Sequence, residues 1–327
     1  MVAIMSREDD FSTSEVIEWI KFSGAKVLRL NEKDKLSILK FDVTADGKIT
    51  LLIEVKGEKY SIDNFNSFWY RRGRLNIDSP KIKLEEINDD VYRDKVKRYL
   101  NNEISVIEEY IISLLEEKKS LGSKSLASIN KLRVLNEANS CGIKTPWTSV
   151  VSDSKSINEN RENIQRMVTK PLSDSLYFSL KTHENKDKFY GTYTSLISDP
   201  LPEKMFPTLI QEQLDKELEL RIFFINESFY SMAIFSQLDK STSVDFRRYN
   251  LAMPNRTTPF KLPLKIEKKL IMLNRKIGLN TGSIDMVVTK ENEFVLLEIN
   301  PVGQFGMVSK PCNYKLEKEV ANFLIKK

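Results

Sequence analysis

The spacing of hydrophobic positions changes several times along the 327-residue chain, and each change predicts a structural element. An apolar run at 2–5 precedes a stretch at 12–22 with helical spacing, for which Ser12 or Thr13 is the expected N-cap. A second apolar run at 26–30 completes a strand–helix–strand order, which is typical of a parallel sheet. We therefore expect an N-terminal α/β domain.

Beyond this point, alternating and helical stretches follow one another to the C-terminus. Strands are expected at 41–44, 49–55, 59–61, 149–151, 167–170, 189–194, 208–214, 216–225 and 228–235, and helices at 89–118, 128–140, 262–277 and 312–326. Leu121-Gly122-Ser123 and a proline-rich connector at 198–207 indicate boundaries. The prediction is an α/β (α+β) fold in three parts, 1–120, 121–206 and 207–327.

Candidate chemistry is concentrated in the stretch 282–306, which is predicted to be a β-hairpin with its turn at 290–293. Asp285 lies early on the first strand, and Glu298 and Asn300 lie late on the second strand, two residues apart and on one face. Antiparallel pairing would bring these three oxygen ligands together, as a magnesium site requires. They could also be ordinary hairpin polar residues. The metal interpretation is favoured because burying an unpaired carboxylate is costly.

Composition narrows the class of protein. With 41% hydrophobic and 30% charged residues, the chain can fold into compact domains. Its net charge of +5 is too small to indicate nucleic acid binding by itself. A lone histidine, His183, excludes a metal site with several histidine ligands, and Cys141 and Cys312 have no metal-ligand spacing. No apolar run is long enough for a membrane span, and the N-terminus does not resemble a signal peptide. A cytoplasmic location is expected.

Basic residues at strand ends are candidates for anion binding. In FWYRRG at 68–73, Arg71 and Arg72 could clamp a carboxylate or phosphate, or they could be solvated arginines after a buried aromatic strand. Lys170 ends a strand just before Pro171 and could project into a cleft. Alternation places Glu217, Glu219 and Arg221 on one strand face. This row could bind a ligand, or it could be an exposed row of salt bridges.

Two motifs carry a resemblance to a known family. The run SIDMVVTKENEFVLLEINPVGQFGMVS at 283–309, together with FWYRRG, is similar to ATP-grasp ligases that modify ribosomally made peptides, and most similar to the grasp-with-spasm type related to microviridin ligases. The resemblance covers nearly the whole chain. It implies the ATP-grasp fold, with an N-terminal domain and a nucleotide cleft between central and C-terminal domains, and it implies ATP and Mg²⁺ as cofactors.

The resemblance also implies roles for individual residues. Asp285, Glu298 and Asn300 would hold the metal, and Lys131 and Lys170 would bind the nucleotide phosphates. Gln211, Glu212 and Leu214 would bind the adenine, and Glu219 would bind the ribose. Arg221 would contact the γ-phosphate or a substrate carboxylate, and Asp245 would hold Arg247 over the reacting phosphate. Lys170, Arg221 and Arg247 would be the catalytic residues, and Arg71, Arg72, Arg221 and Asp245 would contact the peptide. The chain departs from many ATP-grasp enzymes at 172–175, where LSDS stands in place of a glycine-rich phosphate loop.

The activity that this implies is ligation within a precursor peptide that consists of a leader and an acidic core. An Asp or Glu side chain would be phosphorylated and then attacked by a Thr, Ser or Lys side chain, which gives an ester or amide macrocycle, ADP and phosphate. Two alternatives stay open: another ATP-grasp ligase that acts on a protein terminus or on small amino acids, and a peptide-binding protein whose catalytic site has decayed. Family members often form dimers, although the sequence itself shows no interface.

Overall fold

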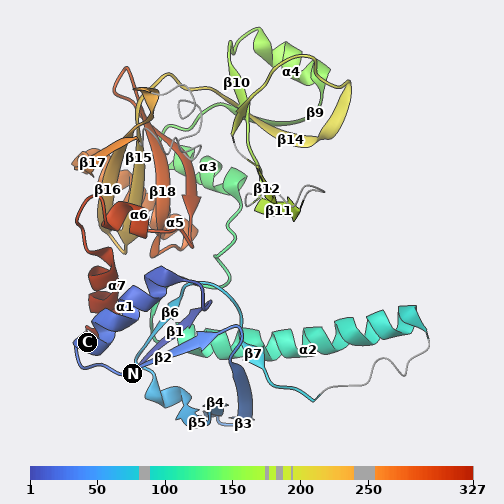
Figure 1. The fold of residues 1–327 in the computed structure, drawn as a ribbon, viewed down its shortest axis with the longest axis vertical. Coiled ribbons are helices and arrows are strands. Elements are labelled where there is room, and N and C mark those ends of the chain that lie inside the picture. The colour runs from blue at the N-terminus through green and yellow to red at the C-terminus, as the bar shows by residue number, and fades with distance from the viewer. Residues whose placement is uncertain (81–88, 174–176, 182–186, 193, 239–254, 327) are drawn as a thin grey trace. The chain divides into compact units, whose positions relative to one another are not determined.

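The computed structural model describes residues 1–80, 89–173, 177–181, 187–192, 194–238 and 255–326 (Figure 1). The chain divides into two compact units. Unit 1 comprises Met1–Ala127, Gln304–Ser309 and Lys315–Lys327, and unit 2 comprises Ser128–Gly303 and Lys310–Tyr314. The division into three parts that the sequence suggests stays a prediction. The first observed break falls after Ala127, and the last helix belongs to unit 1 rather than to a C-terminal part.

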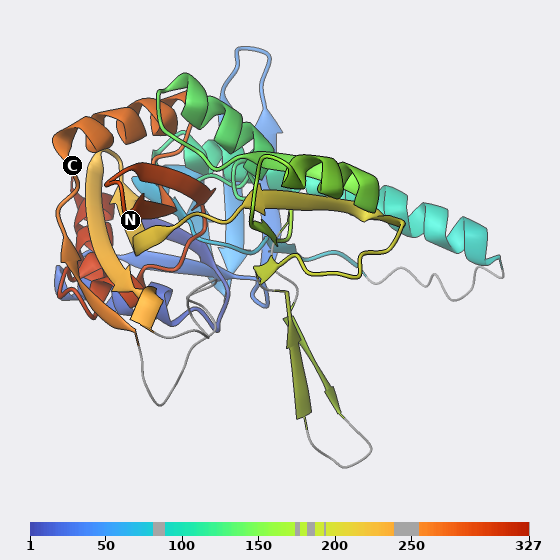
Figure 2. The ribbon, with the colours of Figure 1, turned by 90° about the horizontal axis from the view of Figure 1, so that it is seen from above.

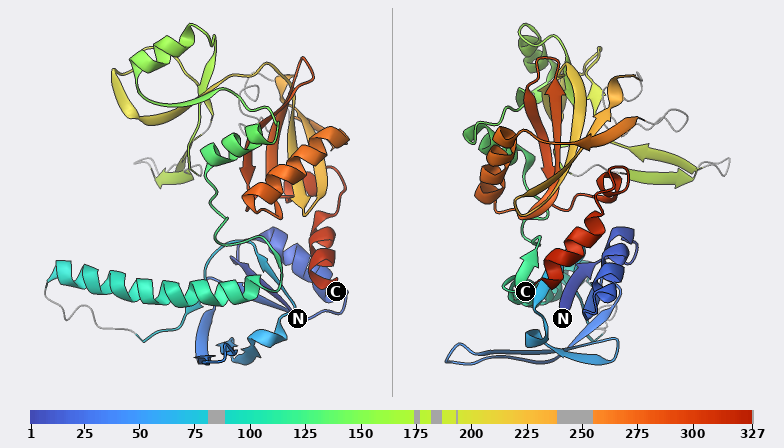
Figure 3. Two further views of the ribbon diagram at one scale, coloured as in Figure 1. Left: turned by 180° about the vertical axis from the view of Figure 1, so that it is seen from behind. Right: turned by 90° about the vertical axis from the view of Figure 1, so that its left-hand side faces the viewer.

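A four-stranded parallel sheet lies at the centre of unit 1. Its strand order is β2-β1-β6-β8, and its elements are β1 (Val2–Ser6), β2 (Val27–Asn31), β6 (Ser67–Tyr70), β8 (Lys119–Leu121) and the crossover helix α1 (Phe11–Phe22). The predicted strand–helix–strand unit is therefore confirmed. The N-cap of α1 is Asp10, whose carboxylate accepts a hydrogen bond from the Thr13 amide, so the expected cap at Ser12 or Thr13 is wrong. Helix α7 (Leu316–Ile325) packs on α1 (Figure 3).

The second sheet of unit 1 is the predicted meander with one added strand. Its strand order is β5-β4-β3-β7, formed by β3 (Lys35–Val43), β4 (Ile49–Val55), β5 (Glu58–Ser61) and β7 (Asn76–Ile77), with a 3-10 turn at Ile62–Asn64. The stretch predicted as one or two helices at 89–118 is the single helix α2 (Asp90–Glu116), whose C-terminal end contacts β6 and β8. Within the described part of the chain, no helix is both long and apolar enough to cross a membrane.

Unit 2 begins with helix α3 (Lys131–Ser140), followed by an antiparallel sheet in the order β13-β10-β14-β9. Its elements are β9 (Thr148–Asp153), α4 (Ser154–Arg161), β10 (Met167–Thr169), β13 (Ser195–Leu196) and β14 (Lys204–Glu212). Val151, Ile157, Met167 and Ile210 form its core. The expected connector at 198–207 is shorter than predicted, because β14 starts at Lys204. Strands β11 (Tyr177–Lys181) and β12 (Asp187–Gly191) pair as a separate hairpin (Figure 2).

The remainder of unit 2 is a five-stranded antiparallel sheet in the order β17-β16-β15-β18-β19. Its strands are β15 (Lys216–Ile225), β16 (Ser228–Phe235), β17 (Arg256–Phe260), β18 (Thr281–Thr289) and β19 (Phe294–Asn300). The 3-10 turn Ser236–Leu238 and helix α5 (Leu264–Ile277) also belong to this part of unit 2, whereas the short helix α6 (Gly306–Ser309) belongs to unit 1. Helix α5 ends at Gly278, which adopts the left-handed conformation expected of a helix stop. Helix α3 packs against β19 and α5.

Candidate active site

The predicted hairpin forms, and its register brings the three proposed metal ligands together. Asp285 on β18 lies opposite Glu298 on β19, and Ser283 lies opposite Asn300. Directly opposed residues of an antiparallel pair share a face, as do residues two apart on one strand. Asp285, Glu298 and Asn300 therefore occupy one face at one end of the hairpin. The confirmed register gives the donor set that a hard cation uses, two carboxylates and one amide.

The end of the hairpin is packed so tightly that its backbone has little freedom. A Cβ atom added to Gly303 would lie 2.3 Å from both Cβ and Oγ of Ser283, closer than side-chain atoms can approach. The Asn300 side chain accepts a hydrogen bond of 3.0 Å from the Val302 amide, which orients its amide group. Close packing after β19 thus holds Asn300 in place.

Two lysines from the first half of unit 2 reach this hairpin. Lys131, at the start of α3, lies 3.4 Å from the Glu298 carboxylate and donates to the carbonyls of Pro171 and Ser173. Lys170, directly after β10, donates to the Leu297 carbonyl at 3.2 Å. Both ammonium groups therefore lie beside the same end of β19. With Arg221 on β15, three positive charges lie around the two carboxylates Asp285 and Glu298. The excess of positive charge favours phosphate binding.

Arg221 adds a third positive charge to this face. It lies opposite Asp285 in the register of β15 and β18, and its Nη1 donates to the Asp285 Oδ2 at 2.5 Å. Arg221 and Glu219 are 9% and 6% exposed, so the alternative interpretation as an exposed row of salt bridges is wrong for these two residues, whereas Glu217 is exposed. A charge-assisted bond in such a buried position is strong and holds both side chains in place.

Glu219 lies two residues before Arg221 and is also buried. Its Oε1 accepts hydrogen bonds from Lys216 Nζ at 2.7 Å and from Ser236 Oγ at 2.6 Å. Burial raises the pKa of Glu219, while the bonds from Lys216 and Ser236 act in the opposite direction. Sequence reasoning missed both of these partners. Lys216 should point to the other face by strand alternation, but a register shift between Lys216 and Leu218 returns it to the side of Glu219.

Comparison with solved structures identifies the fold that carries this site. The RiPP-associated ATP-grasp ligase of Chryseobacterium gregarium, solved with ADP and a leader and core peptide, has a TM-score of 0.75 at 24% identity, covering 99% of this chain and 96% of that one. The macrocyclase MdnC of Microcystis aeruginosa, bound with precursor peptide MdnA, has a TM-score of 0.73 at 24% identity over 99% of both chains. This chain has the ATP-grasp fold. No protein-family model matches it, and no curated protein matches it significantly.

A further ATP-grasp ligase, PsnB with a minimal precursor, Mg and ADP, matches at a TM-score of 0.68 and 14% identity, covering 99% of this chain and 97% of that one. The expected fold is thereby confirmed over the whole chain. Among the residues described, no three His, Cys, Asp or Glu side chains form a metal-binding group. This is compatible with the predicted site, which has only two carboxylates beside the Asn300 amide and would use phosphate oxygens as further ligands.

In this ATP-grasp chain, the predicted adenine-binding stretch runs from β14 into the connection to β15. Gln211 lies between β9 and β10 and donates from its side chain to Thr148 Oγ1 at 2.9 Å. Glu212 accepts a bond of 2.8 Å from the Trp147 amide. Both side chains are therefore used within the sheet, whereas Leu214 follows β14 and begins the connection.

Arg71 and Arg72 belong to unit 1. Asp10 lies 3.1 Å from Nε of each, and Arg71 also stacks over the Phe305 ring, 5.7 Å from its centroid. Arg71 is almost fully buried, and burial lowers its pKa to about 10, while the Asp10 charge opposes that shift. The Arg72 side chain keeps 28% of its surface exposed. Of the two arginines, Arg72 is the one accessible to a ligand.

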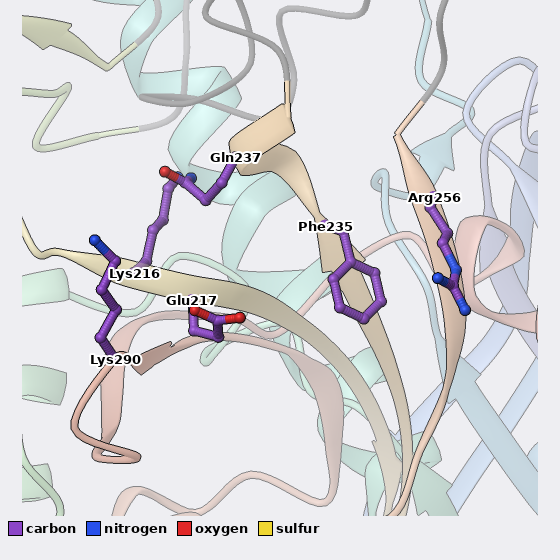
Figure 4. A pocket seen from close by; sticks show the side chains of 6 residues that line it. All are labelled: Lys216, Glu217, Phe235, Gln237, Arg256 and Lys290. Atoms are coloured by element: carbon purple, nitrogen blue, oxygen red, sulfur yellow. The ribbon is translucent and has the colours of Figure 1, made fainter.

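A pocket of about 390 Å³ lies at the end of β15 and β16 (Figure 4). Its lining comprises Lys216, Glu217, Phe235, Gln237, Arg256 and Lys290. Arg256 lies over the Phe235 ring at 5.4 Å, and Lys290 is paired with Asp215 at 2.9 Å. The pocket is lined by three cations and one carboxylate, but two of these cations, Lys216 and Lys290, are already paired with Glu219 and Asp215. Asp245 and Arg247, the remaining predicted residues, lie outside the described residues.

Proposed function

We propose that this protein is an ATP- and magnesium-dependent ligase that cyclises a ribosomal precursor peptide through side-chain esters or amides. The observation that carries the proposal is the meeting of Asp285, Glu298, Asn300, Lys131 and Lys170 at one end of the β18–β19 hairpin, in the fold of ligases solved with peptide and nucleotide. A carboxylate–amide ligand set beside lysines suits the polyphosphate of ATP. A decayed site would have lost members of this set.

The reaction would proceed in two balanced steps. A carboxylate oxygen of a peptide Asp or Glu attacks the γ-phosphorus of ATP, and the bond to ADP breaks. A Thr or Ser hydroxyl or a Lys amine then attacks the acyl carbon, loses its proton, and displaces phosphate. The protein would contribute positioning and charge neutralisation rather than a covalent nucleophile.

Each residue has a distinct part in this proposal. Asp285, Glu298 and Asn300 would hold magnesium, which when bound neutralises phosphate charge. Lys131 and Lys170 would bind phosphate oxygens, and they would exchange their present contacts with Glu298 and Leu297 for them. Arg221, held by Asp285, would face the transferred phosphoryl group or the substrate carboxylate. Arg247, with Asp245 to hold it, would stabilise the charge of the transferred phosphoryl group, and both residues lie outside the described part of the chain.

The nucleoside part of ATP would lie toward β14 and β15. The backbone around Leu214 would bind the adenine edge, since the side chains of Gln211 and Glu212 serve the sheet, and Glu219 would take the ribose hydroxyls. In unit 1, Arg72 would contact the acidic peptide, while the enclosed Arg71 would position Asp10 and Arg72. We also propose a cytoplasmic location, in keeping with the unpaired Cys141 and Cys312.

The direct test is a mass measurement on a precursor peptide. A peptide with a leader and an acidic core bearing Thr, Ser or Lys is incubated with the protein, ATP and Mg²⁺. The proposal expects the loss of one water for each bond formed and one ADP for each water lost. ATP consumption with an unchanged peptide mass would favour a ligase with another acceptor, and the absence of nucleotide binding would favour a decayed site.

Two variants control this assay. Glu298→Gln keeps the size of the side chain but removes the charge of one metal ligand, so turnover should fall by about 10²-fold or more. Lys155→Gln alters a lysine on α4 that is 86% exposed and should leave turnover unchanged. Equal effects of the two substitutions would contradict the assignment of the site.

A further inference from the structure

Two charged side chains at the start of β15, those of Lys216 and Glu219, are paired inside the protein. The two residues are 8% and 6% exposed, and Lys216 Nζ lies 2.7 Å from Glu219 Oε1. Ser236, which is fully buried, donates to the same oxygen at 2.6 Å. Replacing a buried ion pair by apolar residues is often neutral or stabilising, because both charges lose their hydration on burial. The presence of this pair therefore calls for a role other than stability.

An irregularity of the strand brings Lys216 into this position. Lys216 and Leu218 of β15 lie opposite neighbouring residues of β18, so Glu217 between them is one residue too many for regular pairing. In a regular strand, Glu217 would share the face of Glu219, and Lys216 would point to the other face. Instead, Lys216 and Glu217 leave β15 in different directions, with Lys216 extending toward Gln237 (Figure 4). The irregularity thus exchanges a carboxylate for a cation next to Glu219.

The contacts of Glu219 leave one of its oxygens for a ligand. The hydrogen bonds that the structure shows for this side chain, from Lys216 and from Ser236, both end at Oε1. Among the described residues, Oε2 is therefore the oxygen that a ligand can use, and an ionised carboxylate accepts hydrogen bonds but donates none. Lys216 also favours the ionised form, since its charge opposes the effect of burial on the pKa of Glu219. A charged acceptor of fixed orientation suits a ligand that offers hydroxyl donors.

We propose that Lys216 is a positioning residue, which together with Ser236 holds Glu219 so that Oε2 accepts hydrogen bonds from the ribose hydroxyls of the nucleotide. In this role Lys216 acts through Glu219 and need not touch the nucleotide itself. Lys216 follows Leu214 by two residues, so the irregular start of β15 joins the connection that would bind adenine to the acceptor of the ribose. The inference rests on the proposed function only for the assignment of the ribose to Glu219, and it needs no assumption about the peptide.

The test is the loss of affinity when both ribose hydroxyls are removed, measured by titration calorimetry of the full chain with ADP and with 2′,3′-dideoxyADP in the presence of Mg²⁺. The wild type should bind ADP about 10-fold or more tightly than the analogue, which lacks the donors for a charged acceptor. Lys216→Met should reduce this affinity ratio to about 3-fold or less, and Lys216→Arg should restore part of it. Lys290→Met is the matched control, because Lys290 pairs with Asp215 at 2.9 Å at the same end of the sheet but in an exposed position, and it should leave the ratio unchanged.

A double-mutant cycle separates positioning from a general loss of structure. In the Glu219→Gln background, which lacks the charged acceptor, Lys216→Met should leave the affinity ratio unchanged, and this double variant contains no uncompensated buried charge. Ser236→Ala removes only one of the two bonds and should reduce the ratio by a smaller factor, and circular dichroism shows that each variant is folded.

The outcomes distinguish this inference from the proposed function. A wild-type ratio in folded Lys216→Met, or a further loss in the double variant, would overturn the role of Lys216 while the proposed function stands. ADP binding with the expected ratios but without peptide cyclisation would support the role of Lys216 and contradict the proposed function. Failure of the wild type to bind ADP would contradict both.

Discussion

Removing one partner of the buried ion pair between Asp10 and Arg71 should destabilise unit 1 strongly, because the other charge is then left buried and uncompensated. The two side chains are 5% and 4% exposed and lie 3.1 Å apart. Asp10 has a second role as the N-cap of α1, where it accepts a bond of 3.1 Å from the Thr13 amide. Removing the carboxylate therefore leaves a buried guanidinium without its main counter-charge and, in some variants, a helix without its cap.

The two roles can be separated by substitution. Asp10→Asn keeps a side-chain oxygen for the cap but removes the charge, and it should cost about 3–5 kcal/mol of unfolding free energy. Asp10→Ala also removes the cap and should cost about 1 kcal/mol more. In the combined variant Asp10→Asn with Arg71→Met, no buried charge is left uncompensated, so its loss should be smaller than the sum of the single losses.

Urea denaturation, followed by probes in each unit, measures these free energies. Asp9→Asn, which breaks the nearby exposed pair with Arg7, is the matched control and should have little effect. If Asp10→Asn is no more destabilising than Asp9→Asn, or if its effect adds to that of Arg71→Met, then the buried pair does not contribute to stability as the structure indicates.

Three other predictions concern unit 2. Burial raises the pKa of Glu219 above its ordinary value of 4.5, so the native state holds the carboxyl proton more tightly than the unfolded state does. The unfolding free energy of the wild type relative to Glu219→Gln should therefore fall as the pH rises above 4.5, and a constant difference across pH would contradict this. Gly303→Ala forces the new Cβ against Ser283 and should cost about 1–3 kcal/mol of unfolding free energy, measured by thermal or urea denaturation. Gly306→Ala should cost far less, because its new Cβ would lie 3.9 Å from the Ser12 hydroxyl, and equal losses would refute the packing argument. Lys170→Met should lower kcat/KM for ATP by about 10²-fold, with partial recovery in Lys170→Arg, and unchanged kinetics would remove Lys170 from the site.

The parts of the site that depend on strand alternation and pairing could be predicted from the sequence. Opposed residues of a hairpin share a face, so a turn at 290–293 with regular pairing already places Asp285 opposite Glu298. The structure has the same pair, but it reaches it through a register shift between Asp285 and Met286, which the sequence did not indicate. The order of apolar runs likewise predicted the parallel pairing of β1 with β2. These are short-range consequences of the chain's periodicity.

Contacts that depend on irregular backbone or distant packing could not be predicted in this way. Lys216 reaches Glu219 only because of a register shift, and alternation alone places it on the opposite face. Asp10 caps α1 in place of Ser12 or Thr13, and its pairing with Arg71 spans most of the N-terminal region. The return of α7 to pack on α1 joins the two ends of the chain, for which a single sequence contains no local signal.

Capture of the activated peptide carboxylate would detect the proposed acylphosphate itself. A precursor peptide whose Thr, Ser and Lys acceptors are replaced is incubated with the protein, ATP, Mg²⁺ and hydroxylamine. A hydroxamate is expected at an Asp or Glu side chain, formed together with one ADP and one phosphate, and it should be lost in Asp285→Asn. Release of AMP and pyrophosphate, or a hydroxamate yield unchanged by Asp285→Asn, would contradict the proposed mechanism.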